Sequence, residues 1–83
     1  MTTTPYHIRI APAAMRQIIL FSHKQKKTVV KFIEALAINP RPPGSKKIQG
    51  MTGLYSEEIE HMRLIYKIEE QVVMILLVKG IQI

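Results

Sequence analysis

The sequence contains no cysteine, which excludes a disulfide framework and a zinc site built on thiolates. Its few glycines (Gly44, Gly50, Gly53 and Gly80) do not open a helix, so it has no phosphate-binding loop and no dinucleotide fingerprint. Its longest apolar run, residues 72–78, is too short to span a bilayer. The first ten residues lack the charged start and apolar run of a secretory signal. We therefore expect a cytoplasmic protein whose stability depends on an apolar core.

Metal and cofactor chemistry is also not indicated by the sequence. The histidines at positions 7, 23 and 61 are scattered, and none has a carboxylate at the helical spacing that a zinc site requires. No serine lies in the context of a nucleophile elbow. We expect no metal and no cofactor.

The chain is 83 residues long, which is enough for one domain, residues 1–83, and not for two. A chain of this length buries a modest fraction of its surface, so its stability margin should be thin. Because 47% of the residues are hydrophobic, the sequence predicts a folded rather than a disordered chain.

Charge is distributed unevenly along the chain. Residues 1–56 carry nine lysines and arginines against one acid, whereas residues 57–83 carry three against five, and the net charge is +6. A positive field of this size attracts phosphate backbones or acidic protein segments, so the expected partner is acidic. The lysines at positions 24, 26, 27 and 31 have a second interpretation, as the solvated face of a helix.

The first half of the chain predicts a strand followed by two helices. Residues 6–10 alternate apolar and polar side chains, as a half-buried strand does, and residues 11–21 change to a helical period. Ser22 and Gln25 form a capping box for a second helix. That helix should end at Asn39, because a residue before proline avoids the α conformation.

The second half predicts a loop and three strands. Residues 41–53 are rich in proline, glycine and lysine and should form the loop. Strands are predicted at residues 54–59, 62–68 and 72–78, with tight turns between them. The resulting fold is α+β in the order β-α-α-β-β-β, with an αα-hairpin packed on one face of a small, mainly antiparallel sheet.

The open face of this sheet is the predicted site of chemistry. Strand alternation places Arg63 there, between core positions. Metal-free RNA cleavage through the 2′-hydroxyl requires cations at the phosphate, a proton acceptor and a proton donor. Arg63 is the candidate phosphate clamp because a guanidinium can bind two oxygens, and His61 is the candidate acid or base. The candidate RNA-binding residues are Lys46, Lys47, Arg41, Lys24, Lys27 and Lys31.

Each candidate has a simpler interpretation. Arg63 could instead form a surface ion pair with Glu58 or Glu60. A lone histidine in a turn, as His61 is, is most often only solvated, and basic side chains in a loop often serve solubility.

Several short strings resemble the RelE/ParE superfamily of bacterial toxins, over nearly the whole chain from about Tyr6 to Val78. They occur in the family's order and at similar spacings. They are Leu36-Ala37-Ile38-Asn39-Pro40-Arg41-Pro42, Lys47-Ile48-Gln49-Gly50-Met51, Gly53-Leu54-Tyr55 and Met62-Arg63-Leu64-Ile65-Tyr66-Lys67-Ile68.

The resemblance implies the toxin of a type II toxin–antitoxin pair. RelE-like members enter the ribosomal A site and act as mRNA interferases, whereas ParE-like members inhibit DNA gyrase. The implied partners are a small acidic antitoxin, the ribosome and mRNA, in a toxin–antitoxin hetero-oligomer with no membrane.

The sequence departs from the family where the nuclease residues would lie. Ser56 and Glu58 occupy positions that are basic in RelE-like nucleases, and residues 80–83 lack the basic residue and the tyrosine or histidine expected there. Only Arg63 matches the active-site pattern. Three functions therefore remain open: a weakened RelE-like interferase, a ParE-like gyrase inhibitor, or a degenerate toxin that retains antitoxin binding and co-repression.

Overall fold

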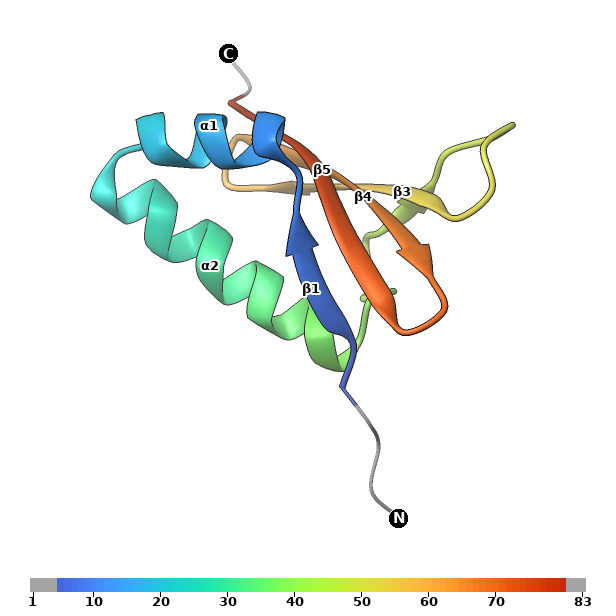
Figure 1. The fold of residues 1–83 in the computed structure, drawn as a ribbon. Coiled ribbons are helices and arrows are strands. Elements are labelled where there is room, and N and C mark those ends of the chain that lie inside the picture. The colour runs from blue at the N-terminus through green and yellow to red at the C-terminus, as the bar shows by residue number, and fades with distance from the viewer. Residues whose placement is uncertain (1–4, 81–83) are drawn as a thin grey trace.

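The computed structural model describes residues 5–80, which form two helices and a five-stranded sheet (Figure 1). In chain order the elements are β1 (His7–Ile10), α1 (Pro12–Leu20), α2 (His23–Ile38), β2 (Lys46–Lys47), β3 (Leu54–Ile59), β4 (Met62–Glu69) and β5 (Val72–Gly80). The strand order is β1-β5-β4-β3-β2; β1 pairs with β5 in parallel, and the other pairs are antiparallel. This architecture confirms the predicted α+β class and the mainly antiparallel sheet.

The core lies between the sheet and the helices because both present an apolar face. Alternate residues of β4 are buried from Met62 to Ile68, as a strand covered on one side requires. Helix α2 contributes Val29, Ile33 and Leu36 at helical spacing. The fully buried large side chains are Tyr66, Leu36, Met62, Leu64, Ile75, Val29, Val73 and Val78.

The two helices begin differently. The predicted capping box of α2 is confirmed: Gln25 N donates to Ser22 Oγ at 3.2 Å, and Ser22 N donates to Gln25 Oε1 at 3.0 Å. Helix α1 has no side-chain cap but begins with Pro12, which is favoured in a first turn. Neither described helix has the length and apolar composition that a membrane crossing requires.

The predicted hairpin turns are confirmed by the backbone. Glu60 and His61 both have positive φ, 43° and 66°, as the two central residues of a type I′ turn do. This turn joins β3 to β4 with the register that pairs Ile59 with Met62. Glu70, with a φ of 54°, belongs to the turn between β4 and β5.

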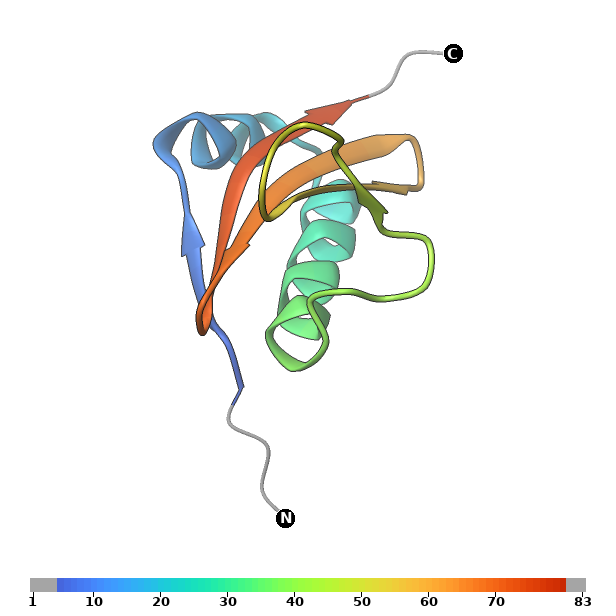
Figure 2. The ribbon, with the colours of Figure 1, turned by 90° about the vertical axis from the view of Figure 1, so that its right-hand side faces the viewer.

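The segment predicted as a loop, residues 41–53, contains the short strand β2, which the sequence analysis missed. Lys46 and Lys47 pair with residues 55–56 of β3, although two lysines carry no strand signal of their own. Gly53 has a φ of 76°, and a Cβ there would lie only 2.8 Å from the carbonyl oxygen of Ile68. Residues 48–53 form a turn, which projects from the end of the sheet away from the helices (Figures 1 and 2).

Candidate functional site

Arg63 is the second residue of β4 and lies on the face of the sheet that the helices leave open. Its neighbours Met62 and Leu64 are buried, so the alternation of the strand turns Arg63 the other way. Half of its side-chain surface remains exposed. The orientation is the one predicted from the sequence.

Glu58 holds the guanidinium of Arg63. It stands opposite Arg63 in the β3–β4 register, and its Oε1 accepts a hydrogen bond from Arg63 Nη2 at 2.5 Å. This hydrogen bond and the positive charge of Arg63 lower the pKa of Glu58, with a weaker contribution from Lys46. The simpler interpretation of Arg63, a surface ion pair with Glu58, is therefore the contact present, and a phosphate would have to displace this carboxylate.

A cleft of about 290 Å³ surrounds this ion pair. Its lining residues are Gly44, Lys46, Ser56, Glu57, Glu58 and Arg63. Two cations thus face two carboxylates in one cleft. A site with this charge balance attracts an anion much less than the cationic site that RNA cleavage requires.

Glu57 also lines this cleft, but its side chain points to the opposite face of β3 from that of Glu58. The two carboxyl groups therefore have different environments. Its Oε2 is inaccessible to solvent and has no hydrogen-bond partner among the described residues. Burial raises the pKa of Glu57. The burial of Glu57 was not predicted from the sequence, although the alternation of β3 indicates that this carboxyl faces the core side.

A stack of three side chains lies beside Glu57. The rings of Tyr55 and Tyr66 are stacked with centroids 5.9 Å apart, and the guanidinium carbon of Arg41 lies 5.4 Å from the Tyr55 ring centroid. Arg41 Nε donates to the Tyr55 hydroxyl at 2.9 Å, and this hydrogen bond raises the pKa of Arg41. Burial raises the pKa of Tyr66 to about 12. Arg41, a candidate RNA-binding residue, therefore packs on an aromatic ring in this structure.

The two lysines of β2 point to different places. Lys46 lines the cleft around Arg63, whereas Lys47 lines a separate recess beside the projecting turn. Consecutive residues of a strand face opposite sides, which explains the separation. Of the six candidate RNA-binding residues, only Lys46 joins Arg63 in one cleft.

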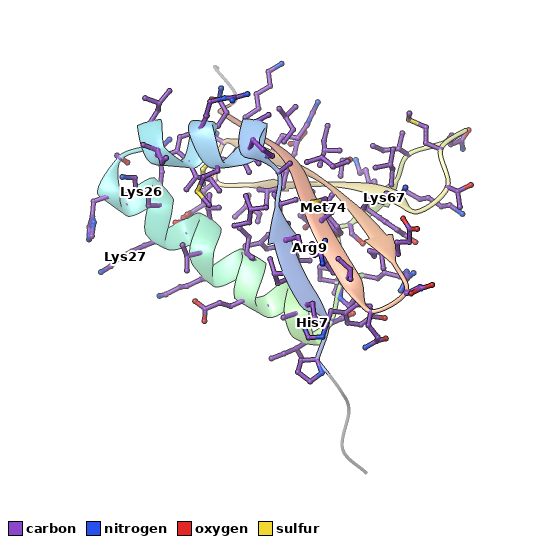
Figure 3. The ribbon with its side chains drawn as sticks, viewed as in Figure 1. His7, Arg9, Lys26, Lys27, Lys67 and Met74 are labelled. Carbon is purple, nitrogen blue, oxygen red and sulfur yellow. The ribbon has the colours of Figure 1, made fainter. Side chains whose placement is uncertain are left out.

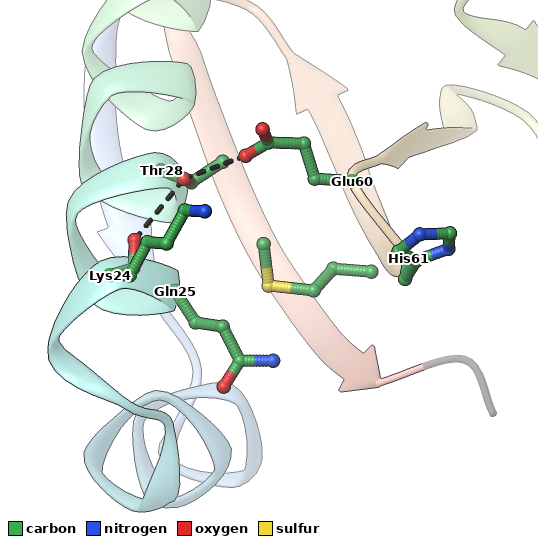
Figure 4. A pocket seen from close by; sticks show the side chains of 6 residues that line it. Lys24, Gln25, Thr28, Glu60 and His61 are labelled. Atoms are coloured by element: carbon green, nitrogen blue, oxygen red, sulfur yellow. Dashed lines mark hydrogen bonds between the residues drawn. The ribbon is translucent and has the colours of Figure 1, made fainter.

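His61 lines a different cavity, of about 360 Å³, between α2 and the β3–β4 turn (Figure 4). Lys24 lines the same cavity. Thr28 Oγ1 donates to Glu60 Oε2 at 2.9 Å across it, which ties the helix to the turn. The structure therefore brings His61 together with Lys24 and not with Arg63, its predicted catalytic partner.

The remaining candidate lysines lie on the solvent side of α2. Lys27 and Lys31 are exposed there, while the buried residues of α2 face the sheet. Figure 3 shows Lys26 and Lys27 on the helix layer, away from Arg9 and Lys67 on the strands. Because α2 covers the face opposite Arg63, these lysines do not contribute to the cleft.

Metal binding is not supported by the described part of the chain. Residues 5–80 contain no cluster of three histidine or carboxylate side chains that could hold an ion.

Comparisons with known proteins identify the fold. No protein-family model matches the sequence, and no curated protein matches it significantly. Among solved structures, the toxin–antitoxin complex RelBE2 from Mycobacterium tuberculosis is similar, with 26% identity, a TM-score of 0.79, and coverage of 92% of this chain and 98% of that chain.

Two further solved structures agree. The isolated E. coli RelE toxin has 21% identity and a TM-score of 0.81, covering 94% of this chain and 86% of its own. The archaeal RelE–RelB complex from Pyrococcus horikoshii has 21% identity and a TM-score of 0.82, covering 94% and 96%. The chain therefore has the RelE fold, and the predicted resemblance to RelE-like toxins is confirmed.

Proposed function

We propose that this chain is the toxin of a type II toxin–antitoxin pair, a RelE-like translation inhibitor with weakened activity as a ribosome-dependent mRNA interferase. The observation that carries this proposal is the RelE fold over nearly the whole chain, with Arg63 at the one matching active-site position. Residues 1–83 would act as one toxin domain in the cytoplasm.

A small acidic antitoxin is the proposed partner. Helix α1 exposes Met15, Ile19 and Leu20, with 42%, 60% and 79% of their surfaces open to solvent. Exposed apolar side chains of this size commonly mark an interaction surface. The basic first two-thirds of the chain would complement an acidic segment that covers them. The proposed functional unit is a toxin–antitoxin hetero-oligomer.

The ribosome and its mRNA are the proposed targets, and Arg63 the proposed contact to the scissile phosphate. Lys46 would hold the same stretch of RNA backbone, because both side chains line one cleft. His61 remains the candidate acid or base, but it lines another cavity and would have to reach the RNA from there. Weak cleavage is the expected consequence, because each missing transition-state donor costs about two to three orders of magnitude in rate.

The test is mRNA cleavage on programmed ribosomes. We expect slow, Arg63-dependent cleavage by the wild-type chain, and none by Arg63→Ala. Glu58→Gln should cleave faster than the wild type, since it removes the charge that competes with the phosphate. Rapid, codon-dependent cleavage that persists in Arg63→Ala would contradict the proposed site.

A second candidate, a degenerate toxin that only binds its antitoxin and represses its operator, is favoured by the same Glu58–Arg63 contact. Full antitoxin binding without cleavage by either the wild type or Glu58→Gln would support it. A gyrase supercoiling assay distinguishes the ParE-like alternative, which needs none of the nuclease residues.

The antitoxin partner can be tested separately. Co-expression with the product of a neighbouring gene that encodes a small acidic protein should raise the solubility and melting temperature of the chain, because a partner that binds only the folded state stabilises it. Ile19→Lys should weaken this effect, whereas Val30→Lys, the same change at an exposed apolar residue of α2, provides a matched surface control. A chain that is equally soluble and stable alone would argue against the partner.

A further inference from the structure

The segment between α2 and β2, residues 40–45, is anchored at both of its ends. At the N-terminal end of the segment, the side chain of Arg41 stacks on Tyr55 and its backbone N–H donates to Asn39 Oδ1 at 3.1 Å. After it, Lys46 pairs with β3. Only residues 42–45 lie between these anchors, and their one internal backbone hydrogen bond runs from Ser45 N–H to the Pro42 carbonyl at 3.1 Å.

This segment lies directly over the carboxyl group of Glu57. Gly44 has a φ of 98°, and a Cβ at that position would be only 2.9 Å from Glu57 Oε1. The other oxygen, Oε2, is inaccessible to solvent and has no hydrogen-bond partner among residues 5–80. One oxygen of this carboxyl group is therefore shielded from water beneath the segment without a hydrogen bond that replaces water.

Lys46 and Arg63 line the same cleft as Glu57, but among residues 5–80 no cation forms an ion pair with it. From β4, the hydroxyl of Tyr66 faces the same side; it is buried and also lacks a hydrogen-bond partner. Lys46 of β2 and Arg63 of β4 act on Glu58, across the strand. Arg41 is engaged by Tyr55, and Ser45 adds only a neutral hydroxyl, which acts on Tyr66 and partly offsets the burial that raises its pKa. An ionised Glu57 would thus hold a negative charge on a partly desolvated carboxylate with no ion-pair partner, whereas the protonated form carries no charge to desolvate.

We propose that residues 42–45 form a cover that closes over the neutral carboxyl group of Glu57 and lifts when that group ionises. Lifting restores water to the carboxylate and breaks the Ser45–Pro42 hydrogen bond. Because Gly44 and Lys46 both line the cleft around Arg63, the cover also changes access to that cleft. The device depends only on the contacts of this chain and not on the proposed function.

The experiment follows two backbone amides of the full-length, ¹⁵N-labelled chain between about pH 4 and pH 8. The Gly44 amide shift reports the charge of Glu57, and hydrogen exchange of Ser45 reports whether the cover is closed. We expect the Gly44 shift to titrate with a midpoint above the ordinary glutamate value of about 4.3. Ser45 protection should fall over the same range, by up to tenfold for each unit by which the pKa in the closed state exceeds that in the open state.

Two variants provide the comparison. Glu57→Gln should abolish the Gly44 titration and keep Ser45 protected at every pH, since it is a neutral side chain of the same shape. Glu58→Gln, one residue away on the opposite face, should leave the Gly44 midpoint and the loss of Ser45 protection in place. Comparing variants at equal pH cancels the intrinsic dependence of exchange on pH.

Three results would overturn the proposal. One is a Gly44 midpoint at the ordinary glutamate value. Another is Ser45 protection that does not change with pH, which would mean that Glu57 ionises under a cover that stays closed. The third is a loss of protection that persists in Glu57→Gln. If that variant does not fold, the wild-type titration alone still decides, through the first two outcomes.

Discussion

The two faces of the sheet are made by the same strands but have different properties. In β4, Leu64 and Tyr66 are fully buried against the helices, while Arg63, Ile65 and Lys67 lie on the other side with substantial exposure. The covered face is mainly apolar, with Glu57 and the hydroxyl of Tyr66 as polar exceptions, whereas the open face of β4 carries Arg63 and Lys67. Most of the stability should therefore come from one face, and the chemistry should be confined to the other.

The adjacent residues Glu57 and Glu58 show the same contrast between the two faces. Glu58 is exposed and paired with Arg63, and its pKa is lowered by that partner. Glu57 is partly buried with no partner, and its pKa is raised by burial. Strand alternation turns the two side chains to opposite faces, where residues 42–45 cover one and Arg63 binds the other, so adjacent residues with identical side chains should respond oppositely to pH.

The largest expected difference between the two faces is the loss in free energy of unfolding when a side chain is truncated to alanine. Leu64→Ala should lower the free energy of unfolding by about 2–5 kcal/mol, because it leaves a cavity in the fully buried core. Ile65→Ala, the adjacent residue on the open face, should cost about 1 kcal/mol. Urea unfolding at constant m-value measures both, and equal losses would mean that the open face is packed as tightly as the covered one.

A smaller difference is expected between the stacked tyrosines. Tyr66→Phe should raise the free energy of unfolding by up to about 1 kcal/mol, because it removes a buried hydroxyl that has no hydrogen-bond partner. Tyr55→Phe should lower it by about 1 kcal/mol, since it deletes the acceptor of the Arg41 hydrogen bond. Thermal and urea unfolding of the two variants test this, and destabilisation by Tyr66→Phe would show that its hydroxyl is satisfied.

The pH dependence of the two carboxylates should have opposite signs. The raised pKa of Glu57 means that its protonated form favours folding, so its contribution is fully present below the unfolded value of about 4.3 and is lost as the pH rises through the folded pKa. The lowered pKa of Glu58 gives a contribution that is present above the unfolded value and lost as the pH falls through the folded pKa.

Urea unfolding of Glu57→Gln and Glu58→Gln against the wild type, across this pH range, tests both signs. Stability differences that change in the same direction for the two variants would refute the contrast. The Glu58 effect should also weaken in high salt, as that of an exposed ion pair does.

The smallest effect is expected for Arg63→Ala. Its side chain is half exposed and its ion pair lies at the surface, so the melting temperature should change little. A large loss of stability would mean that Arg63 is a structural residue and would weaken its assignment to the functional site.

Most of the fold could be predicted from the sequence because its signals are local. The period of two in residues 62–68, the capping box at Ser22 and the Asn-Pro pair at 39–40 each act over a few residues, and the structure agrees with all three. Strand β2 was missed because its pairing comes from β3, through the turn that Gly53 allows, and not from its own side chains.

The candidate site was less predictable because its properties depend on contacts across strands. The sequence identified Arg63 and offered Glu58 or Glu60 as partners, but only the register selects Glu58. It also paired Arg63 with His61, two residues away, although the type I′ turn places His61 at another cavity. The burial of Glu57 required knowledge of where residues 42–45 pass.

The parallel pairing of β1 with β5 has a consequence for how the chain is made. His7 pairs with Val72 and Ile10 with Ile75, so β1 has its neighbouring strand only after β5 has been synthesised. Contacts between such distant parts of a chain form slowly, because the chain loses the entropy of closing a long loop before the contacts stabilise the fold. The helices can assemble during synthesis, but the five-stranded sheet is completed only after β5 has left the ribosome.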